Sequence, residues 1–263
     1  MLKKYFRVYR TLLRLNFDVL VAYRGNFINS LLASLAWGAF SLYSIVLLTS
    51  KTNMVFGWRR EELLLLNGVY GIFISFFHMQ FSRNFERFSE LIHLGHLDSL
   101  LVKPLDSQFL VSFWLFGYAT ISRTIISLIY TFYIAKSLSI SFSLPQLLGI
   151  VALFPAGLLL LYSIWFIIIT ITIWFSRLSN LVELMFTVTG TARYPQEMLR
   201  QVTNYVFVFL FPFTLVVTLP TKAFLNRLHT EELFISAVIT LLLFVFSRKF
   251  WKFALRSYTS ASS

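Results

Sequence analysis

The sequence predicts an all-α, polytopic integral membrane protein that forms a single transmembrane domain over residues 1–263. Of its residues, 57% are hydrophobic and only 13% are charged, and this charged fraction is about half that of an average soluble domain. A soluble chain of this length would need more charge to cover its surface. The apolar residues also fall in blocks about 20 long, enough for a helix to cross a hydrocarbon layer about 30 Å thick.

Charge and cysteine content narrow the classes of function. The formal charge of +12 comes mostly from basic residues beside the apolar blocks, so we expect membrane lipids, not nucleic acid, as their partners. The chain has no cysteine, which excludes disulfides, thiolate metal sites and cysteine nucleophiles. The first 24 residues lack the continuous apolar core of a signal peptide, so no cleaved segment is expected.

An amphipathic helix is predicted within residues 1–24, before the first span. Lys3, Arg7, Arg10 and Arg14 recur at steps of four, three and four, which stacks them on one helical face opposite apolar residues. We interpret it as an interfacial helix whose apolar face sinks into the headgroup boundary. A disordered basic leader that only enforces topology is the alternative.

Apolar length predicts six transmembrane helices with both termini on one side. With this spacing, sixteen basic residues fall in the N-terminal tail, the second and fourth loops and the C-terminal tail, and six fall in the opposite loops. The positive-inside rule therefore places both termini in the cytoplasm. The expected spans are residues 25–49, 63–82, 109–135, 147–175, 202–219 and 233–250.

The second cytoplasmic loop, residues 83–108, is polar yet periodic. Its apolar residues recur at helical spacing, and Gly95 follows where the helix would end. Lys103-Pro104 then breaks the chain, and Asp106 offers an N-cap for the third span. The pattern predicts a short cytoplasmic helix, which either couples to a partner or simply lies on the membrane surface. The candidate coupling residues are Phe85, Glu86, Arg87, Phe88, Glu90, Leu91 and Ile92.

Catalytic motifs are absent from the sequence. It has no GxxxxGK[ST] phosphate loop, no GxSxG nucleophile elbow and no HExxH pair. His93, His96 and Asp98 lie close together, but two His and one Asp are too few for a histidine-rich di-iron site. We therefore expect no catalytic residue, metal or cofactor in this chain, and any ATP must be handled by another protein.

Arg123 is the most costly polar residue within a predicted span. A central Arg costs about 3 kcal/mol on insertion scales, so it should face a partner, a cavity or the interface. Thr120, Thr124, Ser127 and Thr131 recur around it at steps of three or four. This stripe is either the wall of a translocation path or a surface for tight helix packing, and both interpretations stay open. Glu183 is a second ionisable residue near membrane depth.

Three stretches of the chain carry a resemblance to a known family. They are the basic amphipathic leader, the segment GHLDSLLVKP from Gly95 to Pro104, and Arg193-Tyr194-Pro195 followed by Phe211-Pro212 and Leu219-Pro220. In this order they resemble the membrane subunits of bacterial ATP-binding cassette exporters of the type-2 permease class, especially a six-span branch encoded with a second permease and an ATPase. The likeness covers essentially the whole chain.

The resemblance implies a permease subunit without chemistry of its own in the bacterial cytoplasmic (inner) membrane. Two permeases, identical or homologous, would pair, and each would dock a cytoplasmic ATPase through the loop around Phe85 to Leu94. The ATPases would use ATP and Mg²⁺ to drive outward transport. The residue pattern itself makes the stripe around Arg123 the candidate translocation path, and the small residues Ser30, Ser34 and Gly38, which invite close helix approach, the candidate permease dimer interface.

The resemblance conflicts with the fifth span that hydropathy predicts. In this class short re-entrant helices tend to follow the fifth span on the outer side, which would move that span to about residues 178–193 and make 195–226 re-entrant. In this version fourteen basic residues would lie on the cytoplasmic side and eight on the outer side. The positive-inside rule would still place both termini in the cytoplasm. We prefer this version because Pro195, Pro212 and Pro220 punctuate the segment.

Two other classes of function stay open. One is a membrane-embedded lipid-modifying enzyme that uses His93, His96 and Asp98 at the cytoplasmic interface. The other is a purely structural membrane subunit. The substrate is not determined by the sequence, since an aromatic-rich membrane domain suits amphipathic drugs, lipids and hydrophobic peptides alike.

Overall fold

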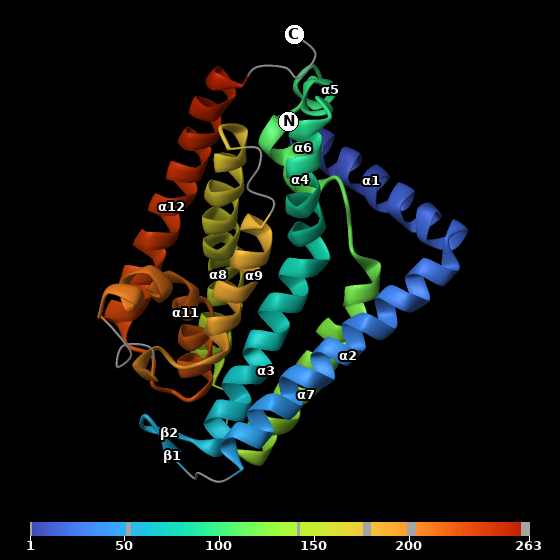
Figure 1. Cartoon of the computed structure of the whole chain (residues 1–263). Helices are drawn as coiled ribbons and strands as arrows, with labels where there is room; N and C mark the ends of the chain where they lie inside the picture. The colour runs from blue at the N-terminus through green and yellow to red at the C-terminus, as the bar shows by residue number, and fades with distance from the viewer. Residues whose placement is uncertain (1, 51–53, 141–142, 176–179, 199–203, 259–263) are drawn as a thin grey trace.

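The structure, a computed structural model, describes residues 2–50, 54–140, 143–175, 180–198 and 204–258 (Figure 1). The longer helices are α1 (Leu2–Ala22), α2 (Arg24–Thr49), α3 (Arg60–Phe77), α4 (Arg83–His93), α7 (Ile121–Ser137), α8 (Leu144–Thr170), α9 (Leu181–Gly190), α11 (Asn204–Phe224) and α12 (Thr230–Ser257). The shorter elements are the antiparallel strands β1 (Met54–Val55) and β2 (Trp58–Arg59), α5 (Leu97–Leu101), α6 (Ser107–Phe113), the π-helical turn His78–Ser82, and the 3-10 turns Tyr118–Thr120, Ile171–Ile173 and Thr191–Arg193.

Several helices are long and apolar enough to cross a membrane. Within the described residues they are Arg24–Leu47, Arg60–His93, Gln146–Ile173 and Thr230–Ser257, with a fifth crossing if the bent pair of α6 and Tyr118–Ser137 forms one span. The predicted all-α, polytopic membrane class is confirmed. The predicted span over residues 202–219 lies partly outside the described residues, so the count of six stays a prediction.

The second predicted span does not end at residue 82. Its helix continues from Arg60 to His93, because one π-helical turn joins α3 to α4. The end of α4 is where the sequence predicted it: Gly95 follows with a φ of 67°, the left-handed conformation that glycine adopts readily after a helix C-terminus. The predicted coupling helix is therefore a continuation of the second span.

The third predicted span, residues 109–135, is broken at residues 114–117, and its halves meet at 59°. Asparagine side chains bind the backbone groups that the break frees. Asn84 donates to Leu115 O at 2.9 Å and accepts from Leu115 N at 2.8 Å, while Asn16 of α1 donates to the preceding carbonyl at 3.0 Å. Irregular backbone at membrane depth is tolerated only where such partners exist.

The N-terminal helix, the second loop and the C-terminal helix meet at one end of the bundle (Figure 1). Lys4 of α1 donates to Pro104 O at 2.7 Å. Asp106 caps α6, as the sequence predicted, by accepting from Phe109 N at 3.1 Å, and its carboxylate also pairs with Arg248 of α12. We refer to this as the terminal end of the bundle.

Ion pairs join the elements at the opposite end, beside the β1–β2 hairpin. Glu62 at the start of α3 accepts from Arg227, which precedes α12, at 2.7 Å. Lys222 near the end of α11 pairs with Glu232 at 2.7 Å and with Glu197 at 3.5 Å. Both ends of the segment 195–226 are thus bound near the same end of the bundle.

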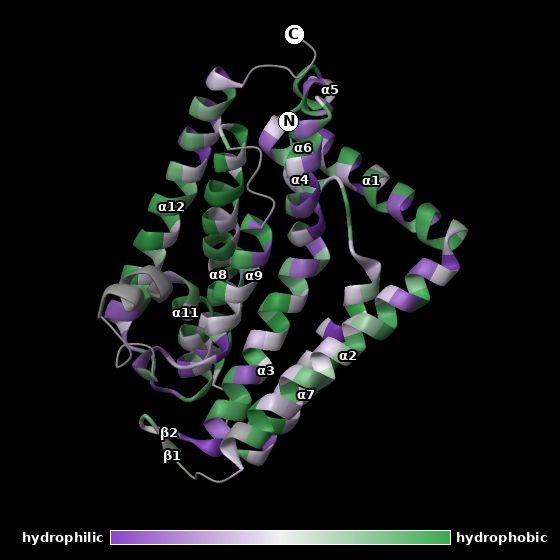
Figure 2. Ribbon diagram, in the orientation of Figure 1, coloured by the Kyte–Doolittle hydropathy of each residue, from purple (hydrophilic) through white to green (hydrophobic). Residues whose placement is uncertain are grey.

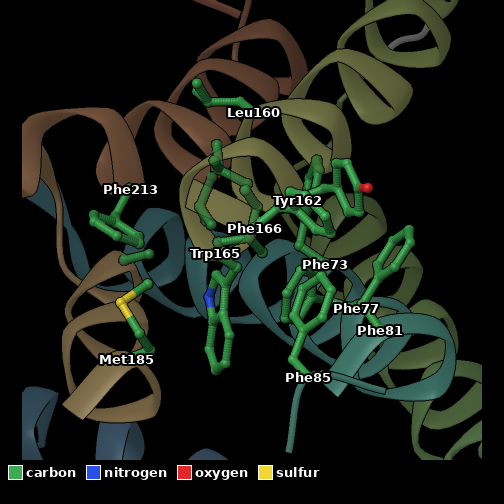
Figure 3. Packing of buried hydrophobic residues seen from close by; sticks show 14 of the residues in the cluster. Phe73, Phe77, Phe81, Phe85, Leu160, Tyr162, Trp165, Phe166, Met185 and Phe213 are labelled. Atoms are coloured by element: carbon green, nitrogen blue, oxygen red, sulfur yellow. The ribbon is translucent and has the colours of Figure 1, made fainter. Parts of the chain in front are cut away.

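The core is aromatic and centres on α3, α4 and α8 (Figure 3). Trp165 and Phe166 of α8 are fully buried, and the Trp165 ring lies 5.1 Å from that of Phe77 and 6.1 Å from that of Phe85. In contrast, α2 lies apart from this core and exposes most of its large apolar side chains. Figure 2 shows hydrophobic residues along much of α8 and α12 as well. Lipid is the solvent that accommodates such a surface.

Candidate functional site: a cavity between α2, α3, α7 and α9

A cavity of about 1000 Å³ lies between α2, α3, α7 and α9. Its lining is mostly apolar and includes Trp37 and Phe40 of α2, Ile74 of α3 and Phe186 of α9. Polar side chains from all four helices interrupt this lining. A mostly apolar cavity with a few convergent polar groups is the usual construction of a ligand site.

Arg123 enters the cavity from the first turn of α7, directly after the break in the third span. Its side chain crosses to Gly38 of α2, where an added Cβ would lie 3.4 Å from Arg123 Cγ. The Nε and Nη2 atoms of Arg123 are buried and have no hydrogen-bond partner among the described residues. The costly cation that the sequence singled out thus lies between helices, on the cavity wall.

A second guanidinium lies on the same wall. Arg193, just after α9, donates through Nε to Gly190 O at 2.9 Å, and its Cζ lies 5.2 Å from the centroid of the Tyr70 ring. Its Nη2 approaches the Tyr70 hydroxyl at 3.5 Å. Arg123 also interacts electrostatically with Tyr70 and with His78 of the π-helical turn. Two arginines and a histidine therefore share one region of the cavity around a tyrosine.

The residues of the predicted stripe on α7 lie in two different surroundings. Thr120, Arg123 and Ser127 line the cavity, as a path wall would. Thr131 is buried against α3 and donates to Ser127 O at 2.7 Å, while Thr124 donates to Thr120 O at 3.2 Å, and neither lines the cavity. Thr124 and Thr131 share the helical face of the stripe but lie at its edge away from the cavity, so their assignment to the path stays a prediction.

The small residues of α2 lie on the cavity side. Ser30, Ser34 and Gly38 all line it. The sequence assigned them to a contact with a second permease, but at Gly38 the close approach is to Arg123 of the same chain. A small-residue pattern predicts close packing and does not name the partner, so the dimer interface at these residues stays a prediction.

Several cavity residues were missed from the sequence. Asn67, Tyr70 and His78 of α3 and its π-helical turn line the cavity, as does Arg193. The signal was present, because residues 67, 70 and 78 repeat at steps of three and eight, which places them on one face of a continuous helix within an apolar span. Arg193 lies outside that helix, so this periodicity does not predict its place in the cavity.

The apolar face of α4 is buried within the chain itself. Phe85, Phe88, Leu91 and Ile92 are at most 8% exposed, and Figure 3 shows Phe85 among the aromatic rings of the core. Their assignment as anchors for an ATPase is therefore corrected. Amphipathicity predicts that one helical face is buried, yet the buried face here packs on α8 and α12 of the same chain.

The polar face of α4 remains accessible at the terminal end. Glu86 and Glu90 are exposed and Arg87 is half-buried. Two apolar side chains accompany them, Leu94 at 57% exposure and Val102 at 82%. We call these five accessible residues the loop surface.

The histidine pair of the second loop does not form a cluster with its neighbouring aspartate. His93 and His96 are exposed, whereas Asp98 hydrogen-bonds to Tyr258 beyond α12. Across the part of the chain that the structure describes, no three His, Asp or Glu side chains are grouped as metal ligands. No observation thus favours the lipid-modifying enzyme.

Several helices long and apolar enough to cross a membrane, with charged groups in a cavity between them, define a multi-pass membrane protein. The chain belongs to the ABC-2 family of transporter proteins, whose family model matches residues 35–262. The resemblance inferred from the sequence is thereby confirmed, and the protein is a membrane component of a transporter. Among curated proteins and solved structures, no match was found.

Proposed function

We propose that the chain is the non-catalytic permease subunit of an ATP-binding cassette exporter and that the cavity beside α2 is part of its translocation path. The observation that carries the proposal is Arg123, a cation on the cavity wall in the second half of the bent pair that forms the proposed third span. Such intramembrane charges mark substrate or ion pathways. In the proposed complex ATP and Mg²⁺ are bound by a separate cytoplasmic ATPase.

The terminal end of the bundle is the proposed cytoplasmic side, in the inner membrane of a bacterium. The meeting of both termini with the second loop at this end supports that orientation, since these segments hold most of the basic residues. The loop surface, formed by Glu86, Arg87, Glu90, Leu94 and Val102, is the proposed docking site for the ATPase. Its two exposed apolar side chains suit a contact that excludes water.

A second permease, identical or homologous, is proposed to close the path on the side of α2. The support is the outer face of α2, which exposes Trp37, Phe40 and Tyr43 at 60% or more of their surface. Because Trp37 and Phe40 also line the cavity, a partner seated there would share its wall. Lipid covers this face in the absence of a partner.

The segment 195–226 is proposed to be re-entrant on the outer side. The ion pair of Glu197 with Lys222 supports this, because it holds the two ends of the segment together. Trp58 of the hairpin also donates to Glu197 at 3.0 Å. A full span would separate the two ends by about 30 Å of hydrocarbon.

Co-purification with a phosphate-loop ATPase tests the proposed function. We expect the wild-type chain to retain the ATPase encoded beside it through affinity purification in mild detergent. Changing Leu94 and Val102 together to Asp should reduce the yield of ATPase at least tenfold, because a charged loop surface opposes an apolar contact. Ser257→Asp, at an exposed position of the same end, is the matched control and should retain the ATPase. Normal yield in the double variant would refute the docking site, and absence of any ATPase with the wild-type chain would refute the exporter.

A further inference from the structure

Neither arginine of the cavity forms an ion pair within the part of the chain that the structure describes. No Asp or Glu oxygen of the described residues lies within 4.0 Å of the guanidinium of Arg123 or Arg193. Two carboxylates do line the cavity, Glu86 and Glu183, but both are exposed in the first turns of α4 and α9, and Glu86 interacts with Arg83. The inner part of the cavity is therefore positively charged.

Unpaired hydrogen-bond donors line the same cavity as these cations. Besides Arg123, three cavity residues have a buried polar atom without a partner among the described residues: Oγ of Ser34, Nδ2 of Asn67 and the hydroxyl oxygen of Tyr130. Each of these groups can donate. Since buried polar groups in proteins almost always have partners, a set of unpaired donors from α2, α3 and α7 that line one cavity indicates that a ligand with acceptor groups binds there. An anionic oxygen group supplies several acceptors at once and forms the stronger, charge-assisted bonds.

The rest of the cavity suits an apolar group. Trp37, Phe40, Ile74, Ile126 and Phe186 line it, and its volume of about 1000 Å³ far exceeds the space that an inorganic anion occupies. Sites for drug-sized ligands have volumes of about 300–1000 Å³. A ligand that fills this cavity therefore needs an apolar body as well as an acidic head.

We propose that the cavity binds an amphipathic anion, whose phosphate, sulfonate or carboxylate head lies between Arg123 and Arg193 and whose apolar body lies along α2 and α7. The inference gives a substrate class to the proposed translocation path and rests on that proposal. Arg123 serves as the charged anchor of the head, and the free donors of Ser34, Asn67 and Tyr130 offer further hydrogen bonds to polar groups of the ligand along the cavity. Membrane lipids and water-soluble amphiphiles share this chemistry.

Binding of radiolabelled decyl phosphate to the full chain in phosphatidylcholine nanodiscs tests the proposal, with empty nanodiscs as background. We expect saturable binding of the radiolabelled decyl phosphate. Unlabelled decyl phosphate should compete for the site, and decyl trimethylammonium should need at least a tenfold higher concentration to compete equally, because its cationic head is repelled. Inorganic phosphate should not compete, because it lacks the apolar body. Competition by phosphatidic acid would indicate that the natural ligand is a membrane lipid. Competition by decyl phosphate but not by phosphatidic acid would indicate a water-soluble amphiphile. Either result supports an amphipathic anion as the ligand.

Charge variants locate the head group. Arg123→Gln and Arg193→Gln should each weaken binding of decyl phosphate, and the double variant should weaken it at least tenfold, while Arg123→Lys should retain most of it. Lys136→Gln removes a charge from the exposed end of the same helix and should bind as the wild type. If Arg123→Gln does not fold, Arg193→Gln alone provides the test.

Equal competition by the cationic amphiphile, or wild-type binding in the arginine variants, would overturn the proposal. Binding is measured on the chain alone, without ATPase, so a failure of the exporter proposal would not affect it. Conversely, ATP-driven export by a chain that shows no preference for acidic heads would overturn only the substrate class.

Discussion

Arg123 of α7 lies against Gly38 of α2, with its Cγ 3.4 Å and its Cδ 3.5 Å from the position that a Cβ of residue 38 would occupy. The absence of a side chain at residue 38 lets a guanidinium lie between two membrane-crossing helices. The cavity, the proposed path and the proposed anion site all depend on this approach.

Enlarging residue 38 should therefore destabilise the protein. Gly38→Leu places a branched side chain where Arg123 lies, and such overpacking costs about 1–3 kcal/mol, so the midpoint of thermal unfolding in detergent should fall. Gly38→Ala should be tolerated, because 3.4 Å is close to ordinary van der Waals contact. Gly25→Leu is the control on the same helix, since nothing lies within 4 Å of a Cβ at that position. An equal effect of the two leucine substitutions would contradict the packing described here.

The break in the third span should depend on Asn84. Asn84→Ala removes both bonds to Leu115 and the bond to Gln80 O, and each buried group left unpaired costs about 1–3 kcal/mol. We expect a lower unfolding midpoint and faster proteolysis near residues 114–117. Asn26→Ala, at an exposed position, should change neither. Wild-type stability in Asn84→Ala would show that other groups satisfy the broken backbone.

The pair of Asp106 and Arg248 should make stability depend on pH below the neutral range. Burial alone would raise the pKa of the Asp106 carboxyl, but the hydrogen bond from Arg248, the N–H of Phe109 and the nearby guanidinium charge together hold it below its ordinary value of 3.8. A lowered pKa means that the stabilisation is complete above the pKa of the unfolded chain and is lost as the pH falls through that of the folded chain.

Unfolding midpoints of wild type and Asp106→Asn between pH 7 and pH 3 check this dependence. The variant should be less stable by about 1.5–3 kcal/mol at pH 7, the usual contribution of a hydrogen bond between charged groups. The difference should be constant down to about pH 5 and shrink below about pH 4. Asp18→Asn, which alters an exposed carboxylate, should follow the wild type. A difference that persists unchanged at pH 3 would rule out the ion pair as its cause.

If the segment 195–226 is re-entrant on the outer side, residues 197 and 222 should both be accessible to a reagent added outside the cell. The chain has no cysteine, so Glu197→Cys and Lys222→Cys introduce single thiols without further changes. Both should react with a membrane-impermeant maleimide added to intact cells, whereas Ser99→Cys on the loop of the terminal end should react only after lysis. Labelling of only one of the two outer positions would instead indicate a full span between them.

The sequence by itself determined the class of this protein and many of its helix limits. Apolar length sets where a chain can cross lipid, so the predicted spans 25–49, 147–175 and 233–250 lie close to α2, α8 and α12. The sequence also predicted two helix limits correctly: Asp106 caps α6 and Gly95 follows α4. Such capping signals can be predicted because they act within a few residues.

The tertiary structure decided which partner each pattern meets. Periodicity predicted an apolar face on α4 but not that Phe85 and Phe88 would be buried within the chain itself, and small residues on α2 predicted close packing but not the approach of Arg123 to Gly38. The break at residues 114–117 rests on Asn84 and a second asparagine about 100 positions away along the chain. Such contacts join side chains distant in sequence, and periodicity within one helix contains no information about which other helix comes to lie against it.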